Sequence, residues 1–355
     1  MRGNLRLPAR LAAAVTGLTL VAGLHKTPAH ADSLDDLYAL AKQERTLVMW
    51  AAGPSAGYES AARSFEQRFP GITVSLKGGF SNVLNAQIEE QLNTNKLESD
   101  IVVLQTIQDL VGWNARGLLL HFKPDEFDRV RVSMRDRDGA WIALSTNPIF
   151  YAYNTDKLRL EDIPTSAIDF LKTRFKGKLI SAYPADDDAT LYAFNTIVRK
   201  YGWGYMDQYR AQMPRYIQGH LGVARSLASG ESWATFDATV STMLSVRREG
   251  GKVELTGPKD DLVPVFFAAE AILKNAPHPN AAKLYVTWFL SRQWQSQLGV
   301  YSSRQDVPAP AGLPRLMDYR LDDHYLEFLT NENLPELRRR FETYTGPVTN
   351  VGDVR

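Results

Sequence analysis

The sequence predicts an α/β fold in two doubly wound lobes, and three observations support this prediction. The chain has 355 residues, of which 44% are hydrophobic, and this is enough for two domains with buried cores. Short β-rich runs alternate with helical patterns from residue 32 onward, as is typical of sheets with mostly parallel strands. No low-complexity tract separates the halves, so we expect strand crossings to join the lobes in a hinge.

Residues 1–31 are expected to form an export signal that is not part of this fold. Arg2, Arg6 and Arg10 precede an apolar run, and Ala29-His-Ala31 places small residues at both positions that determine cleavage. The apolar run is shorter than a comfortable membrane span, so we expect cleavage after Ala31 and release into the periplasm. An uncleaved membrane anchor is the alternative, whereas a lipid anchor is excluded because the chain has no Cys.

Composition argues against several classes of function. Removing residues 1–31 takes away four bases and no acid, so 41 bases and 40 acids become 37 and 40, a net charge near −3. This balance lacks the basic excess that binding to nucleic acid requires. The absence of Cys excludes thiol nucleophiles, zinc–thiolate sites and iron–sulfur clusters. Motifs of serine hydrolases, zinc proteases, phosphate loops and dinucleotide-binding loops are also missing, so we expect no enzyme and no cofactor.

The first lobe is predicted from three strand–loop–helix units. In order, they comprise a strand over residues 46–50, a helix over 58–69, a strand over 72–76, a helix that repeats Leu84, Ile88 and Leu92, and a strand over 101–104. Ligands of open α/β sheets bind beyond the carboxyl ends of the strands, so the loops after these strands should converge on one site. The expected contacts there are Gly53, Ser55, Tyr58, Gly79, Ser81, Gln105 and Thr106. Helix capping is the alternative role for Ser55 and Ser81, and core packing is the alternative for Tyr58.

The second lobe is predicted to begin where two β-like runs, residues 141–144 and 149–153, flank the segment that ends at Pro148. Its expected elements are a strand over 177–183, helices over 189–201, 221–229 and 239–249, and a short strand over 233–236. A return crossing is expected near residues 253–258. The predicted domains are therefore residues 32–146 with 257–300, and residues 147–256 with 301–355.

Polar residues of the second lobe complete the predicted site. The candidates are Asn147 at the crossing, Asp187 and Asp188 of an acidic trio, and Phe236 with Asp237 at the end of the short strand. The alternatives are that the acids before the helix satisfy its free N–H groups, that Asn147 is explained by the proline after it, and that Asp237 is a solvated turn residue.

Two basic residues outside this set could also contact a ligand. His220 is expected at the surface or behind a ligand contact, and Arg304 is expected either to reach an anion or to pair with Asp306.

Five stretches spread over nearly the whole chain support a family assignment. They are residues 65–74 (FEQRFPGITV), 99–103 (SDIVV), 153–158 (YNTDKL), 267–285 (FAAEAILKNAPHPNAAKLY) and 303–307 (SRQDV). The chain thereby resembles the ferric-type extracellular solute-binding proteins of bacterial ABC importers. The resemblance implies a class II periplasmic-binding-protein fold and a monomer that captures a small solute in the cleft between its lobes and delivers it to a membrane permease. Independently of the family, Asn280 is expected to cap a helix that starts at Ala281.

One departure from the family pattern bears on the ligand. Ferric-binding members use an adjacent Tyr pair in the segment that corresponds to residues 233–243, and this chain has no Tyr there. Phenolates build a hard Fe(III) site, so a small organic solute is the expected ligand, and no metal site is predicted. The alternatives are ferric binding through other ligands, a ligand-presenting adaptor for a membrane sensor and, last, a secreted hydrolase.

Overall fold

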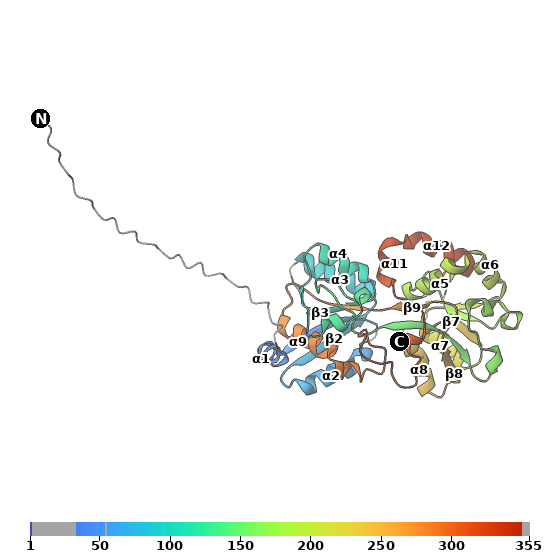
Figure 1. The fold of residues 1–355 in the computed structure, drawn as a ribbon, viewed down its shortest axis with the longest axis horizontal. Coiled ribbons are helices and arrows are strands. Elements are labelled where there is room, and N and C mark those ends of the chain that lie inside the picture. The colour runs from blue at the N-terminus through green and yellow to red at the C-terminus, as the bar shows by residue number, and fades with distance from the viewer. Residues whose placement is uncertain (2–32, 54, 95, 350–355) are drawn as a thin grey trace. The chain divides into compact units, whose positions relative to one another are not determined.

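The computed structural model describes residue 1 and residues 33–53, 55–94 and 96–349. The predicted export signal and its cleavage site after Ala31 lie outside these residues, apart from Met1. The strands of the described part form two larger sheets and one short pair (Figure 1). Within the same residues, no helix is long and apolar enough to cross a membrane.

The first sheet has the strand order β10-β3-β1-β2. Strands β1 (Thr46–Ala52), β2 (Thr73–Gly79) and β3 (Ile101–Leu104) are parallel, and β10 (Ala269–Ile272) is antiparallel to β3. All four residues of β3 are buried, which explains its uninterrupted apolar sequence. The helices of this part are α1 (Leu34–Glu44), α2 (Ala56–Arg68), α3 (Ser81–Thr94), α4 (Ile107–Ala115), α9 (Pro279–Leu290) and α10 (Arg292–Gln295).

The expected cap of helix α9 was wrong. The helix begins at Pro279, so Asn280 lies inside its first turn and does not precede it. The free N–H groups of this turn are satisfied by Glu44, which ends α1. Its carboxylate accepts hydrogen bonds of 3.2 and 2.7 Å from the backbone and side chain of Asn280 and one of 2.8 Å from the backbone of Ala281. A carboxylate from a distant helix therefore replaces the local cap.

The second sheet is mostly antiparallel, which differs from the prediction of mostly parallel strands. Strand β4 (Asn147–Asn154) is its centre, with β7 (Ala234–Thr239) along one edge and both β8 (Val253–Thr256) and β9 (Val263–Phe266) along the other. All three neighbours run opposite to β4, and β11 (Leu321–Asp322) joins β9 in parallel. The chain passes from this sheet to the first between Phe266 and Ala269, later than the crossing expected near residues 253–258.

Three helices of the second lobe lie close to their predicted positions, namely α5 (Asp188–Tyr201), α7 (His220–Ala228) and α8 (Val240–Arg248). Three more, α6 (Gly204–Ala211), α11 (Tyr325–Asn331) and α12 (Leu334–Thr345), were not predicted. Strand β5 (Ile180–Ala182) pairs in parallel with β6 (Arg215–Ile217). The expected β-like run at residues 141–144 forms no strand. Instead, Ile142 makes isolated bridges with Arg135 and Glu270.

Arg304 fixes a passage of the chain that runs between the two sheets. Its guanidinium is fully buried and lies 2.7 Å from the carboxylates of both Glu126 and Asp306, and it donates a further bond of 2.9 Å to the carbonyl of Leu290. Of the two roles expected for Arg304, the structure therefore supports the ion pair with Asp306. A guanidinium with three fixed acceptors is a rigid anchor.

Candidate functional site

Gly53 and Gly79 join the carboxyl ends of β1 and β2. Each glycine donates its N–H to the carbonyl of the other, at 2.8 and 3.0 Å. Gly53 has a φ of +92°, a backbone conformation that residues with a Cβ rarely adopt. The sequence-predicted convergence of these two loops is therefore present in the structure.

Ser81 links the second loop to the third. Its Oγ accepts a hydrogen bond of 3.1 Å from the backbone N–H of Gln105. Helix α3 begins at Ser81 itself, so the side chain joins two loops and does not cap the helix. Thr106, at the start of α4, donates its hydroxyl to Asp109 at 2.5 Å. Asp109 follows Thr106 by three residues, which is the spacing of a helix capping box. This pattern is visible in the sequence and is a signal that could have identified Asp109.

Ser55 and Tyr58 shape the first loop. Ser55 is half-buried and makes no side-chain capping bond to α2, whereas its carbonyl accepts from the backbone N–H of Tyr58 at 2.9 Å. The Tyr58 hydroxyl donates to the carbonyl of Ala52 at 2.8 Å, and burial raises the pKa of this phenol. Tyr58 therefore remains a neutral donor that holds the end of β1 in place.

The acidic trio of the second lobe lies at the start of α5, and each member has a polar partner. Asp187 caps the helix by accepting from the backbone N–H of Thr190 at 2.8 Å. Asp188 forms an ion pair with Arg338 of α12. Asp186 accepts a bond of 3.2 Å from the side chain of Gln218. The capping alternative is thus correct for Asp187, and the other two carboxylates bind side chains from elsewhere in the fold.

Asp237 lies in a fully buried polar network at the end of β7. Its carboxylate accepts bonds from the hydroxyl of Ser181 at 2.9 Å, the backbone N–H of Ala182 at 3.0 Å and the hydroxyl of Thr190 at 3.2 Å. His220 Nε2, at the start of α7, lies 2.9 Å from its other oxygen. The alternative role for Asp237, a solvated turn residue, is therefore wrong.

The charge of the network follows from this geometry. Burial lowers the pKa of His220, but the adjacent Asp237 carboxylate outweighs burial and raises the pKa of His220 to about 9. Burial also favours the neutral form of Asp237, while the imidazolium and the other donors hold the pKa of that carboxyl below its usual range. The two residues therefore form a buried ion pair at neutral pH. Sequence reasoning expected His220 at the surface or behind a ligand contact and gave no signal for this partner, because the two residues lie on different elements.

Phe236 does not line a site, which corrects the prediction for this residue. Its side chain is 2% exposed, and its ring centre lies 4.7 Å from that of Phe194, 5.0 Å from Tyr209 and 5.7 Å from Phe170. Successive strand residues point to opposite faces of a sheet. Phe236 therefore packs in an aromatic core while Asp237 points to the polar network. Asn147, at the crossing, is half-buried and begins β4 opposite Phe266 of β9.

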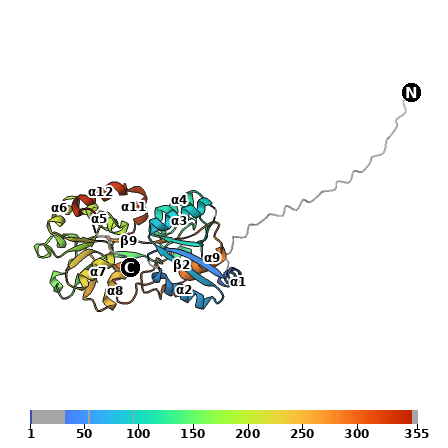
Figure 2. The same ribbon diagram turned by 180° about the vertical axis from the view of Figure 1, so that it is seen from behind.

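Helix α11 brings the ends of the two sheets together. It packs against α4, which follows the loop of Gln105 and Thr106, and against α5, which begins at Asp188, and both ribbon views place it between these helices (Figures 1 and 2). Burial raises the pKa of Asp188, the Arg338 guanidinium opposes this shift, and the charges of Asp187 and Asp109 add to it. Sequence reasoning missed Asp109 and Arg338 as neighbours of the site.

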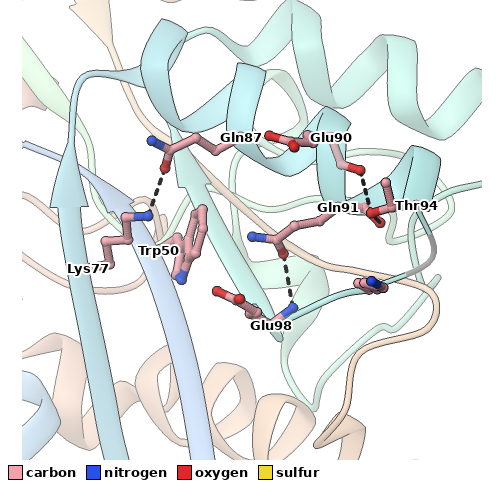
Figure 3. Close-up of a pocket in the computed structure, with 8 residues that line it drawn as sticks. Trp50, Lys77, Gln87, Glu90, Gln91, Thr94 and Glu98 are labelled. Atoms are coloured by element: carbon pink, nitrogen blue, oxygen red, sulfur yellow. Dashed lines mark hydrogen bonds between the residues drawn. The ribbon is translucent and has the colours of Figure 1, made fainter.

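A cavity of about 400 Å³ lies against the faces of β1 and β2 and the second half of α3 (Figure 3). Its lining residues are Trp50, Lys77, Gln87, Glu90, Gln91, Thr94, Lys96 and Glu98. The Lys77 ammonium lies 3.6 Å from the centre of the Trp50 ring and donates to Gln87 at 2.7 Å. None of the residues predicted to contact ligand lines this hollow. Trp50 and Lys77 lie in the carboxyl-terminal halves of β1 and β2, and the other lining residues come from α3 and the segment that follows it.

Comparisons with known proteins agree with this architecture. The model of the bacterial extracellular solute-binding protein family matches residues 60–319. A probable ABC transporter periplasmic-binding protein of Sinorhizobium fredii is 20% identical over 264 residues, which cover 69% of each chain. An uncharacterised protein of Haemophilus influenzae is 21% identical over 260 residues, covering 70% of this chain and 74% of that protein.

Two solved structures are similar over most of this chain. Iron-bound HitA from Pseudomonas aeruginosa has a TM-score of 0.69 and 20% identity, covering 83% of this chain and 99% of its own. AfuA from Actinobacillus pleuropneumoniae, with fructose 6-phosphate bound, has a TM-score of 0.66 and 19% identity, covering 84% and 98%. The predicted fold of a class II periplasmic-binding protein is therefore confirmed.

Proposed function

Because this chain belongs to the bacterial extracellular solute-binding protein family, we propose that it captures a small solute between its two lobes and delivers it to the membrane permease of an ABC importer. The observation that carries the proposal is the convergence of polar loops from both sheets. Gly53 meets Gly79, Ser81 meets Gln105, and α11 brings α4 and α5 together. Ligands of open α/β sheets bind at such strand ends.

The proposed contacts come from both sheets. The first sheet contributes Gly53, Ser55, Gly79, Ser81, Gln105 and Thr106, and the second lobe contributes Asn147, Asp187 and Asp188. Tyr58 and Asp237 act indirectly in this proposal, since their polar atoms are occupied in holding loops and helix starts. Strand β4 and the passage after β9 connect the sheets, and a hinge at these crossings would let the lobes close on the solute.

We propose binding without catalysis. The family consists of binding proteins, and the buried acid–base pair of this chain is not arranged for nucleophilic chemistry. The Ser181 hydroxyl donates to Asp237 and not to the imidazole of His220, so no serine–imidazole relay forms. Thr190 contacts the same His220 nitrogen that faces Asp237. The network instead positions the starts of α5 and α7.

A small organic solute fits the described residues better than ferric iron. HitA was solved with iron and AfuA with fructose 6-phosphate, so similar folds hold chemically different ligands. Two phenols near the proposed site already have partners, because Tyr58 donates to the carbonyl of Ala52 and Tyr183 lies 3.1 Å from the hydroxyl of Thr349. Iron(III) would need such oxygens free and ionised. Export to the periplasm, release as a monomer and docking on a permease complete the proposal.

Thermal melting with a solute library tests this function. The full chain is expressed with its export signal, purified from the periplasm, and melted with amines, sugar phosphates, phosphonates, amino acids and Fe(III) citrate. Binding to the native state alone stabilises the protein, so one chemical class is expected to raise the melting temperature and to reduce the radius of gyration in X-ray scattering. If no class raises the melting temperature and no solute copurifies, the proposal is wrong.

A further inference from the structure

We propose that residues 346–349, which follow α12, form a strap that lies against the second-lobe side of the proposed site. The strap weakens the binding of solute until a solute displaces it. This inference rests on the proposed function, because it concerns how the same site is opened. It adds an inhibitory contact that the chain makes with itself.

Helix α12 holds the start of the strap on the second lobe. Phe341 of this helix is fully buried, and its ring centre lies 4.8 Å from that of Trp203 and 5.6 Å from that of Phe194 in α5. Arg338 of the same helix forms an ion pair with Asp188 at the start of α5. The strap therefore leaves from a fixed point on the lobe that carries Asp188, which is one of the proposed contacts.

Gly346 turns the chain away from the axis of α12. The helix ends at Thr345, and the N–H of Gly346 donates to the carbonyl of Glu342 at 2.9 Å. Gly346 then takes a φ of +76°, which residues with a Cβ rarely adopt. The three steps from Gly346 to Thr349 span at most about 11 Å. A tether this short gives Thr349 a high local concentration beside the lobe, which favours even a weak contact.

Thr349 contacts the loop that leads to a proposed ligand contact. Its hydroxyl lies 3.1 Å from the hydroxyl of Tyr183, which directly follows β5. The carbonyl of Tyr183 accepts bonds of 3.1 and 3.3 Å from the N–H groups of Asp186 and Asp187. Tyr183 therefore begins the loop before α5, at the carboxyl end of a strand, where ligands of α/β folds bind. The strap lies at this same strand end.

The strap is held weakly enough to be displaced. Pro347 and Thr349 are exposed, while Val348 is half-buried. Among the described residues, the contact with Tyr183 is the one hydrogen bond that a side chain of the strap makes. A single neutral hydrogen bond corresponds to about fivefold in an equilibrium constant. Because a hydroxyl both donates and accepts, a solute that displaces Thr349 gains Tyr183 as a partner.

Three variants separate the strap from the rest of the fold. A chain that ends at Thr345 lacks the strap but keeps the buried Phe341. Thr349→Val keeps the strap and its shape but removes the hydroxyl. Thr343→Val is the matched control, because Thr343 is exposed on α12 and its hydroxyl donates to a carbonyl of the same helix at 2.7 Å.

Calorimetric titration of the parent protein and the three variants measures the effect of the strap on binding. Each protein is dialysed free of copurified solute and titrated with 1,4-diaminobutane, glucose 6-phosphate, methylphosphonate, arginine and Fe(III) citrate. A compound that binds the parent is expected to bind Thr349→Val about fivefold more tightly, and the shortened chain by at least as much, since no strap competes with it. Thr343→Val should bind like the parent. A gain in the shortened chain alone would refute the role of Thr349.

Nitration of Tyr183 gives a readout that needs no solute. The side chain is 5% exposed, so removal of the strap should speed its reaction with tetranitromethane, which peptide mass spectrometry locates. The chain has no Cys to consume the reagent. If Tyr183 is nitrated at the same rate in the shortened chain and in the parent, the strap does not cover this hydroxyl and the inference is wrong.

The binding results also distinguish the strap from the function on which it rests. If a compound binds all four proteins with equal affinity, the strap is refuted while solute capture stands. If no compound binds even the shortened chain and none copurifies, solute capture is refuted and the inhibitory role falls with it.

Discussion

Ser81 Oγ accepts a hydrogen bond of 3.1 Å from the backbone N–H of Gln105, and this contact ties the loop after β2 to the loop after β3. Together with the paired glycines 53 and 79, it makes one continuous rim from three separate segments. The proposed site is therefore held by backbone groups and a serine hydroxyl. Such a rim depends on the exact loop geometry, which single substitutions can test.

Ser81→Ala should loosen this rim. The variant leaves the Gln105 N–H without its acceptor, which costs on the order of 1 kcal/mol in unfolding free energy, and it should weaken binding of any solute that the parent protein captures. Urea denaturation and calorimetric titration measure the two effects. Ser75→Ala, on the exposed face of β2, is the control and should change neither. Equal affinities for Ser81→Ala and the parent would show that the rim does not position ligand contacts.

The His220–Asp237 pair should make stability depend on pH. Asp237 raises the pKa of His220 from 6.5 to about 9, so the imidazolium stabilises the folded state fully below pH 6.5, and this contribution is lost as pH rises through 9. The loss amounts to about 3 kcal/mol, at about 1.4 kcal/mol for each pH unit between the two values.

The substitution His220→Gln tests this dependence. Urea denaturation between pH 6 and 9.5 should give a shallower decline for the variant than for the parent protein. His324→Gln is the control, because His324 is largely exposed and should leave the decline unchanged. If the unfolding free energy of His220→Gln falls with pH as steeply as that of the parent protein, His220 is not charged in the folded state.

Glu270 should be a neutral acid in the folded protein at pH 7. Burial raises its pKa from 4.5 to about 8, its side chain is 6% exposed, and one carboxyl oxygen has no hydrogen-bond partner in the described part of the chain. Its contribution to stability is therefore complete below pH 4.5 and is lost as pH rises through 8. Infrared spectroscopy at pH 7 should detect a protonated carboxyl group that is missing in Glu270→Gln.

The variant Glu270→Gln should also reduce the dependence of the unfolding free energy on pH. Glu270→Gln removes the cost of ionising a buried carboxyl, so its unfolding free energy should decline less than that of the parent between pH 5 and 8. Glu249→Gln, an exposed substitution in the turn after α8, should behave like the parent. A protonated-carboxyl band that persists in Glu270→Gln would assign the neutral acid to another residue.

Arg304→Met should destabilise the protein by about 3 kcal/mol. The fully buried guanidinium contacts Glu126, Asp306 and the carbonyl of Leu290, and its removal leaves two carboxylates without their cation. Arg304→Lys should lose less, because it keeps the charge but not the forked geometry. Guanidinium denaturation measures both, with the exposed Arg137→Met as control. If Arg304→Met is as stable as the parent protein, the ion pairs of Arg304 make no net contribution to the unfolding free energy.

Elements with a strong local pattern were predictable from the sequence. The apolar runs of β1 and β3 indicate buried strands, Leu84 and Ile88 mark the buried face of α3, and glycines mark the loops that meet at the rim. The antiparallel pairing of β4 was not predictable, because pairing depends on strands that are far apart in the sequence.

The errors in the predicted site have the same origin. The sequence of β7 alternates apolar and polar residues and so places Phe236 and Asp237 on opposite faces, but both faces are buried, and the alternation alone does not show that the polar face holds a buried network. Glu44 satisfies the start of α9 from a position 236 residues away, a distance over which no local capping signal acts. Asp188 and Arg338 likewise meet only through the packing of α12 near α5. The roles of these residues therefore depend on partners that are far away in the sequence, and local sequence patterns do not reveal such partners.

Native mass spectrometry of the full chain after export and rapid purification from the periplasm tests solute capture most directly. We expect a folded monomer that carries one small molecule, which is released on acid unfolding and identified by its mass. A spectrum of unliganded protein alone, with no adduct after the library compounds are added back, would contradict the account.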